Sequence, residues 1–138
     1  MNASDAERWL GYARSDLAAA TTLVASPDHY PRQVCFLAQQ AAEKALKAAL
    51  IAQEFEFPFT HDLDRLRNLL PDKWTVKKAF PDLAEMTIWA VEARYPADMP
   101  EVLESDARRA LKVASEIIRL IEDCLLYTSP SPRDGLLS

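Results

Sequence analysis

The segment from Phe36 to Leu50 constrains the fold more than any other part of the chain, because it is an alanine- and leucine-rich helical sequence that carries several polar groups. At about 100° per residue, one helix face collects small and apolar side chains: Val34, Ala38, Ala41, Ala45, Ala48 and Ala49. Such a face lets a neighbouring helix approach closely. The opposite stripe is polar but bracketed by apolar residues, and it holds Phe36, Gln40, Glu43, Lys47 and Leu50. It fits neither a plain core nor a plain solvated surface.

Apolar residues at helical spacing predict this helix and four others in the chain. The predicted helices cover about 5–25, 31–53, a short stretch capped by Thr60 and ended by Pro71, 81–94 and 100–126. Each long helix has an apolar stripe that needs a partner, and the connections are mostly short. The sequence therefore predicts an all-α fold, an antiparallel up-and-down bundle of four long helices plus a short one.

The chain has 138 residues, a length that suits one domain, which we place at 1–126. From Tyr127 onward the helical pattern stops, and two prolines and a glycine follow within a few residues. We interpret 127–138 as an irregular tail that is foreign to the domain.

The net charge is −5, which disfavours tight nonspecific binding to nucleic acid but leaves room for a local basic cleft. The first residues are charged, and no apolar stretch approaches the about 20 residues that span a membrane, so the sequence predicts a cytoplasmic protein with no membrane partner. Cys35 and Cys124 are interpreted as buried thiols. No metal-ligand set, phosphate-binding loop or nucleophile with a nearby base is present, so no cofactor, metal or catalytic residue is predicted.

Asp16 is expected on or beside the buried face of the first helix, where an unpaired carboxylate would cost several kcal/mol. Its candidate partners are Lys44, Lys47 and Arg94. Two interpretations remain open, an ion pair that fixes the docking of the first helix and a group that organises a ligand.

Glu43 and Lys47 have the i, i+4 spacing of a solvated surface pair, but Gln40 joins the same stripe and can both donate and accept. His61 follows the expected cap of the short helix, so it is either a capping or packing residue or a functional one. Arg94 can bond the last carbonyls of its helix or, with Tyr95 beside it, contact a phosphate or a base.

Four motifs in register carry a resemblance to a known family: Trp9 with Asp16-Leu17, Phe36-x-x-x-Gln40-Ala-Ala-Glu43-Lys44-Ala-Leu-Lys47, Thr60-His61-Asp-Leu63 and Ala93-Arg94-Tyr95-Pro96. Together they resemble the HEPN (higher eukaryotes and prokaryotes nucleotide-binding) domain family over about residues 5–125. The resemblance implies a helical bundle that commonly forms homodimers. It also implies a genomic association with a minimal nucleotidyltransferase in prokaryotic toxin–antitoxin or defence pairs.

Ribonucleases of that family carry an arginine followed by four to six residues and then a histidine, in a site composed from two protomers. Here the nearest arginine upstream of His61 is Arg32, and the nearest upstream of His29 is Arg14, so the pattern is absent. By resemblance, the expected ligand-binding or dimer-organising positions are Asp16, Gln40, Glu43, Lys44, Lys47, His61, Arg94 and Tyr95.

The sequence therefore predicts a noncatalytic module that binds a nucleotide or RNA, or docks a nucleotidyltransferase partner. Two alternatives remain. One is a ribonuclease toxin in which His61 acts as general acid and base while Arg94 stabilises phosphate charge. The other is a scaffold for a helix dimer whose function resides in another chain.

Overall fold

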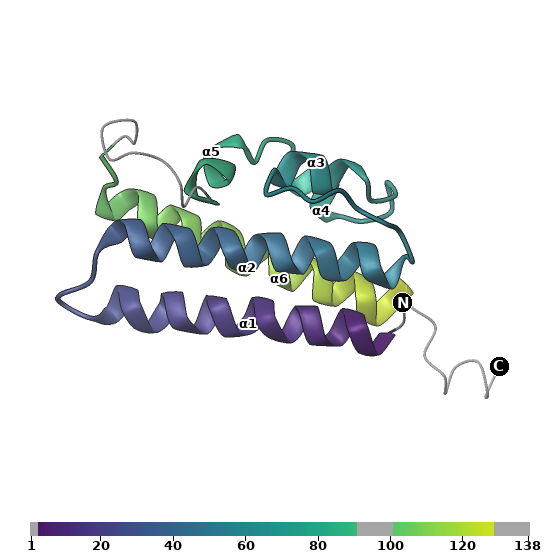
Figure 1. Cartoon of the computed structure of the whole chain (residues 1–138), viewed down its shortest axis with the longest axis horizontal. Coiled ribbons are helices and arrows are strands. Elements are labelled where there is room, and N and C mark those ends of the chain that lie inside the picture. Colours follow the sequence, from purple (N-terminus) through teal and green to yellow (C-terminus); the bar gives the residue numbers. More distant parts are fainter. Residues whose placement is uncertain (1–2, 91–100, 129–138) are drawn as a thin grey trace.

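The computed structural model describes residues 3–90 and 101–128 and shows three long helices beneath a layer of short ones (Figure 1). The long helices are α1 (Ala3–Ala25), α2 (Pro31–Ala52) and α6 (Glu104–Thr128). The short layer consists of α3 (Leu63–Asn68), α4 (Val76–Ala79), α5 (Ala84–Thr87) and the 3₁₀ helix η1 (Ile88–Ala90). The predicted all-helical bundle is confirmed, and no helix in the described ranges is long and apolar enough to cross a membrane.

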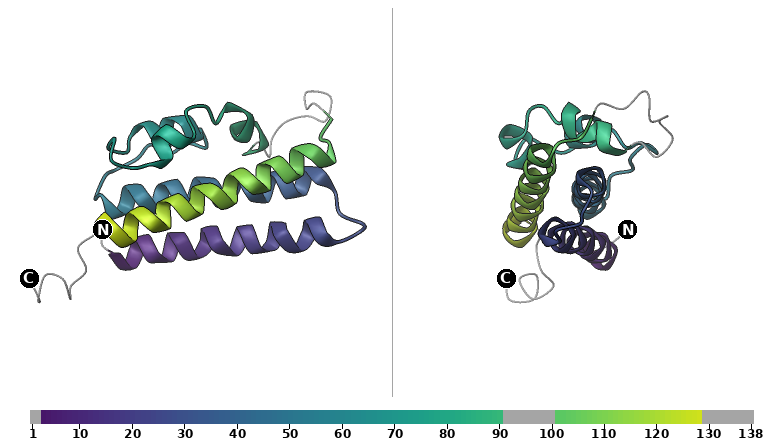
Figure 2. Two further views of the ribbon diagram at one scale, coloured as in Figure 1. Left: turned by 180° about the vertical axis from the view of Figure 1, so that it is seen from behind. Right: turned by 90° about the vertical axis from the view of Figure 1, so that its left-hand side faces the viewer.

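α2 is the central element, with α1 and α6 along its sides and the short helices above it (Figure 2). Its alanine face is fully buried, as the sequence predicts. Cys35 on α2 and Cys124 on α6 are also buried, and burial raises the pKa of the Cys35 thiol to about 12.

α1 runs antiparallel to α2, but α2 and α6 run in the same direction (Figure 1). After α2 the chain passes through the short-helix layer, which ends at Ala90 in the described ranges, and α6 begins at Glu104. The sequence predicts a long fourth helix over 81–94. In the described part of that range, the chain forms only α5 and η1, while 91–94 lie outside the described residues.

The contacts of this segment give a physical reason for this difference. Leu83, Met86 and Trp89 are buried and recur every three residues, a spacing that fits one face of an α-helix as well as a 3₁₀ turn. In addition, the Thr87 hydroxyl bonds the Leu83 carbonyl (3.2 Å) and accepts from the Leu63 amide (3.1 Å). The segment is thus fastened to α3.

The short helix α3 begins later than its predicted cap Thr60, because Asp62 is the N-cap. The Asp62 carboxylate accepts from the backbone amides of Asp64 (3.0 Å) and Arg65 (3.3 Å). A carboxylate at this position also interacts favourably with the helix dipole. The Thr60 hydroxyl instead accepts from the Asp62 amide (3.1 Å) and closes the turn before the helix.

The end of α2 is a Schellman turn without glycine. Glu54 has φ 57°, the Glu54 amide bonds the Ile51 carbonyl (2.9 Å), and the Phe55 amide bonds the Leu50 carbonyl (3.0 Å). This reversal directs the following aromatic segment back toward the bundle.

α6 continues to Thr128, so the first two residues of the tail expected at 127–138 are helical. Residues 129–138 lie outside the described residues, and the foreign origin of the tail stays a prediction.

Replacing Ala45, which is 0% exposed on the face of α2 that forms the core, by leucine is expected to destabilise the fold by about 1–3 kcal/mol. The added atoms have no space and must displace a neighbouring helix. Ala19→Leu on the exposed face of α1 is the control, because it adds the same atoms in solvent. Urea unfolding measures both, and equal stability of the two variants would contradict close packing around α2.

Candidate functional site

Three polar side chains on one stripe of α2 are buried inside the bundle. Gln39 is 0% exposed, Glu43 4% and Lys47 8%. Their spacing of four residues places them on successive turns of the same helix face. Buried polar groups of this kind must be satisfied within the protein.

The Glu43 carboxylate is the centre of this network. It accepts hydrogen bonds from Lys47 Nζ (2.8 Å), His61 Nδ1 (2.8 Å) and Gln39 Nε2 (3.1 Å). Burial alone would raise the pKa of Glu43, but the bonds from Lys47, His61 and Gln39 outweigh burial and hold the pKa below its ordinary value. Glu43 is therefore ionised at neutral pH.

Both the nitrogen and the oxygen of the Gln39 side-chain amide form hydrogen bonds, and these bonds extend the network. Its Nε2 also donates to the His61 backbone carbonyl (3.3 Å), and its Oε1 accepts from Gln40 Nε2 (2.8 Å). These bonds, together with the turn at Asp62, fix the segment that precedes α3 against α2.

The Lys47 ammonium lies between two aromatic rings as well as against Glu43. Nζ is 5.7 Å from the ring centroid of Trp9 on α1 and 5.7 Å from that of Phe57, which lies between α2 and α3. Cation–π attraction at this range stabilises a buried ammonium. Lys47 thereby joins three parts of the chain.

His61 brings the buried network to the surface, because 53% of its side chain is exposed. Its Nδ1–H donates to a carboxylate, so Nε2 accepts in the neutral ring and donates when the ring is protonated. None of the described residues bonds Nε2. Phe59, which is 98% exposed, lies edge-on to the imidazole at 6.0 Å between ring centroids.

Asp16 and Lys44 form a separate ion pair between α1 and α2, with 2.6 Å between Oδ2 and Nζ. Of the three cations that the sequence suggests as partners of Asp16, Lys44 forms the ion pair. The pair is about one quarter exposed, and no described contact connects it to Glu43.

The structure therefore joins four of the eight candidate residues in one network centred on the Glu43 carboxylate: Glu43, Lys47, His61 and Gln40, of which Gln40 is joined through Gln39. The interpretation of Glu43 and Lys47 as a solvated surface pair is wrong, because the rings of Trp9 and Phe57 and the segment before α3 cover them. Arg94 and Tyr95 lie outside the described residues. Sequence reasoning missed Gln39, although the strict spacing of Gln39, Glu43 and Lys47 marks one stripe.

His29 is the second polar junction. Its Nδ1 donates to the Ser26 carbonyl (2.6 Å), and its Nε2 lies 2.6 Å from Glu104 Oε2 at the start of α6. The bond to Ser26 and then the Glu104 carboxylate raise the pKa of His29, against smaller opposing effects of desolvation and then of Arg108. Protonated His29 thus ties the α1–α2 connection to α6.

No group of three metal-ligating side chains converges in the described part of the chain. The arrangement is instead a buried carboxylate, an ammonium and an imidazole, and it defines a helical domain with an internal acid–base network. Such a network can hold a histidine in a fixed orientation at the surface.

A family model described as HEPN domain matches residues 6–124, and this chain belongs to the HEPN domain family. Two solved structures agree. TT1696 from Thermus thermophilus is 28% identical with a TM-score of 0.75, covering 89% of this chain and 98% of that chain. ST0689, an archaeal HEPN homologue, is 27% identical with a TM-score of 0.65, covering 86% of this chain and 95% of that chain. A search among curated proteins gave no significant match.

Glu43→Gln is expected to lower the free energy of unfolding at pH 7 by about 3 kcal/mol, because it leaves the Lys47 ammonium buried without its counter-charge. The folded pKa of Glu43 is depressed, so wild type gains this stability above pH 4.5 and loses it as pH falls through the folded pKa. Urea unfolding from pH 3 to 7 measures the difference. Glu116→Gln on the exposed face of α6 is the control. If both variants lost an equally small part of the free energy of unfolding, the result would contradict a buried Glu43–Lys47 pair.

His29→Gln is expected to remove a pH-dependent part of the stability. The folded pKa of His29 is raised above 6.5, so its contribution is complete below pH 6.5 and is lost as pH rises through the folded pKa. Thermal unfolding of wild type and His29→Gln between pH 5.5 and 9 should show that wild type is the more stable protein at acidic pH and that the difference in stability disappears at alkaline pH. A constant difference across this range would contradict the protonated bridge.

Proposed function

We propose that this chain is a noncatalytic nucleotide-binding or partner-docking module of a prokaryotic pair that includes a minimal nucleotidyltransferase. One observation carries the proposal: the buried Glu43 holds His61 at a place where half of the His61 side chain and the ring of Phe59 are exposed. Membership of the HEPN family supports it, and the similar structures from Thermus thermophilus and an archaeon support a prokaryotic setting.

The chemistry of this surface suits a nucleotide. An exposed aromatic face such as Phe59 can stack on a base, at about 1–3 kcal/mol per base. Lys47 already balances the charge of Glu43, so protonation of His61 adds a net positive charge beside the ring, where a phosphate can accept from Nε2.

The same surface suits a protein partner. Exposed aromatic side chains are typical of interfaces, and Tyr12 (49% exposed) and Phe55 (39% exposed) are exposed as well as Phe59. Tyr12 lies edge-on to Trp9, which contacts Lys47, while Phe55 follows the turn at Glu54. Homodimerisation, which the family implies, would use such a surface equally well.

A ribonuclease remains the second candidate because of one specific contact. A carboxylate bonded to Nδ1 of a half-exposed histidine is an arrangement that orients a general base. The missing arginine–histidine spacing counts against this candidate, and Arg94, which it needs, lies outside the described residues.

Titrating adenine and guanine nucleotides and short single-stranded RNAs into the full chain by calorimetry tests the proposal. Saturable binding is expected, with an about 5- to 150-fold loss in Phe59→Ala, the equivalent of about 1–3 kcal/mol of stacking, and a further loss in His61→Ala. The control is Leu103→Ala, which removes an exposed apolar side chain at the start of α6.

The RNA is then analysed for cleavage products. Intact RNA supports the binding module, whereas products that disappear in His61→Ala support the ribonuclease. Absence of saturable binding, or equal binding by Phe59→Ala and wild type, would contradict the nucleotide site.

A further inference from the structure

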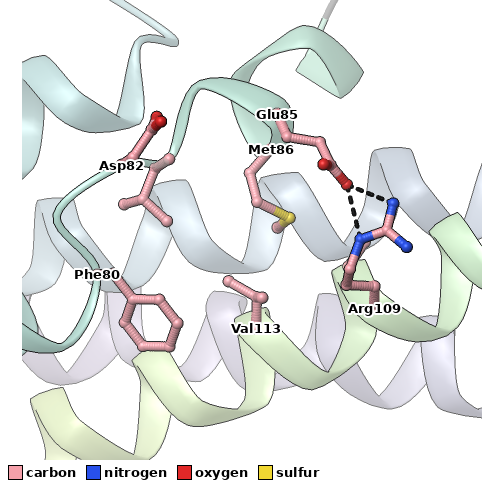
Figure 3. A pocket seen from close by; sticks show the side chains of 8 residues that line it. Phe80, Asp82, Glu85, Met86, Arg109 and Val113 are labelled. Atoms are coloured by element: carbon pink, nitrogen blue, oxygen red, sulfur yellow. Dashed lines mark hydrogen bonds and ion pairs between the residues drawn. The ribbon is translucent and has the colours of Figure 1, made fainter.

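A cleft of about 140 Å³ lies between the segment that precedes and forms α5 and the outer face of α6 (Figure 3). Most of its lining is apolar, with Phe80, Leu83, Met86, Ala110 and Val113 as walls and Asp82, Glu85 and Arg109 as the charged residues. It lies apart from the network around Glu43, which none of these residues contacts through a hydrogen bond.

The backbone of the wall that carries Phe80 and Leu83 is held by hydrogen bonds with side chains of α3. Arg67, which is buried, donates to the Phe80 carbonyl (2.8 Å), and the Asp64 carboxylate accepts from the Leu83 amide (2.8 Å). Arg67 and Asp64 are themselves an ion pair. The cleft is therefore a formed feature of the fold, which reduces the cost of ordering it around a ligand.

The charge at its rim is negative. Arg109 bonds Glu85 through Nε (2.9 Å) and Nη2 (2.7 Å), as Figure 3 shows, and it also bonds Asp106. Two carboxylates thus already balance one guanidinium. Both bonds to Glu85 use Oε1, so its Oε2 has no bond within the described ranges. Asp82 adds a further carboxylate, of which one oxygen accepts from the Ala84 amide (2.9 Å).

The size of the cleft limits what it can hold. An apolar cavity of about 150 Å³ accommodates a benzene molecule, so a six-carbon ring or a chain of similar volume fits. The Met86 thioether gives this wall an adaptable, polarisable surface against such a ring.

We propose that this cleft binds a small organic cation, with an apolar body of about six carbons against Phe80, Met86 and Val113 and an ammonium group at Glu85 Oε2, while Asp82 on the other side of the cleft adds negative charge to the rim. An anion of the same shape meets unbalanced carboxylates at the rim, and a neutral molecule gains only the apolar contact. This site is independent of the proposed nucleotide surface, so either can fail without the other.

Three probes of nearly equal shape test the assignment, benzylamine, benzyl alcohol and benzoate, of which the first is cationic at neutral pH. The full chain carries three methionines, so a ¹³C-methyl label on methionine gives a Met86 signal that Met86→Leu assigns. Benzylamine is expected to shift this signal saturably and to bind about fivefold more tightly than benzyl alcohol, with no response to benzoate.

The variant Glu85→Gln with Asp82→Asn keeps the shape and an oxygen that can accept from the Ala84 amide while it removes the charges, and it should abolish the preference for the amine. Val113→Phe should block all three probes by filling the cleft, and Glu116→Gln, at an exposed carboxylate elsewhere on α6, should change nothing. Equal binding of amine and alcohol, a preference for benzoate, or no shift of Met86 would overturn the proposal.

Discussion

α2 is enclosed along most of its length, and this enclosure is the constraint on which the rest of the structure depends. A helix in that position can contact its neighbours closely only if most of its side chains are small, which its alanines provide. Any polar side chain on its buried faces must then find partners inside the protein, because water is excluded there. Glu43 illustrates the result, since its three donors come from α2 itself and from the segment before α3.

The same network connects stability with the exposed surface. Glu43 fixes the orientation of His61, Lys47 contacts Trp9 and Phe57, and Gln39 holds the backbone of the segment that carries Phe59. A buried ion pair contributes little net stability compared with well-packed apolar residues, but it sets a specific geometry. The surface near His61 is thus positioned by groups that a ligand never touches.

Most of the fold follows from the sequence because long helices are recognisable from their apolar spacing, as α1, α2 and α6 are. The segment that forms α5 and η1 could not be predicted as well. Leu83, Met86 and Trp89 have a spacing that fits a 3₁₀ turn as well as one face of an α-helix, and the contact of Thr87 with Leu63, which fastens the segment to α3, cannot be seen in the sequence. Likewise, the i, i+4 pair Glu43 and Lys47 looks the same in sequence whether it is solvated or covered. Only the tertiary arrangement of Trp9 and Phe57 shows that it is covered.

The parallel course of α2 and α6 also affects the order in which contacts form during folding. α1 and α2 are joined by the short connection 26–30, whereas α6 reaches α2 only after 53–103 has been closed into a loop. Closing the longer loop costs about 2 kcal/mol more in chain entropy. We therefore expect the α1–α2 pair to be structured in the folding transition state and α6 to dock later, which φ-values at Ala13 and Ile117 can distinguish. In a chain still being synthesised, the alanine-rich face of α2 then stays partly uncovered until the last helix has been made.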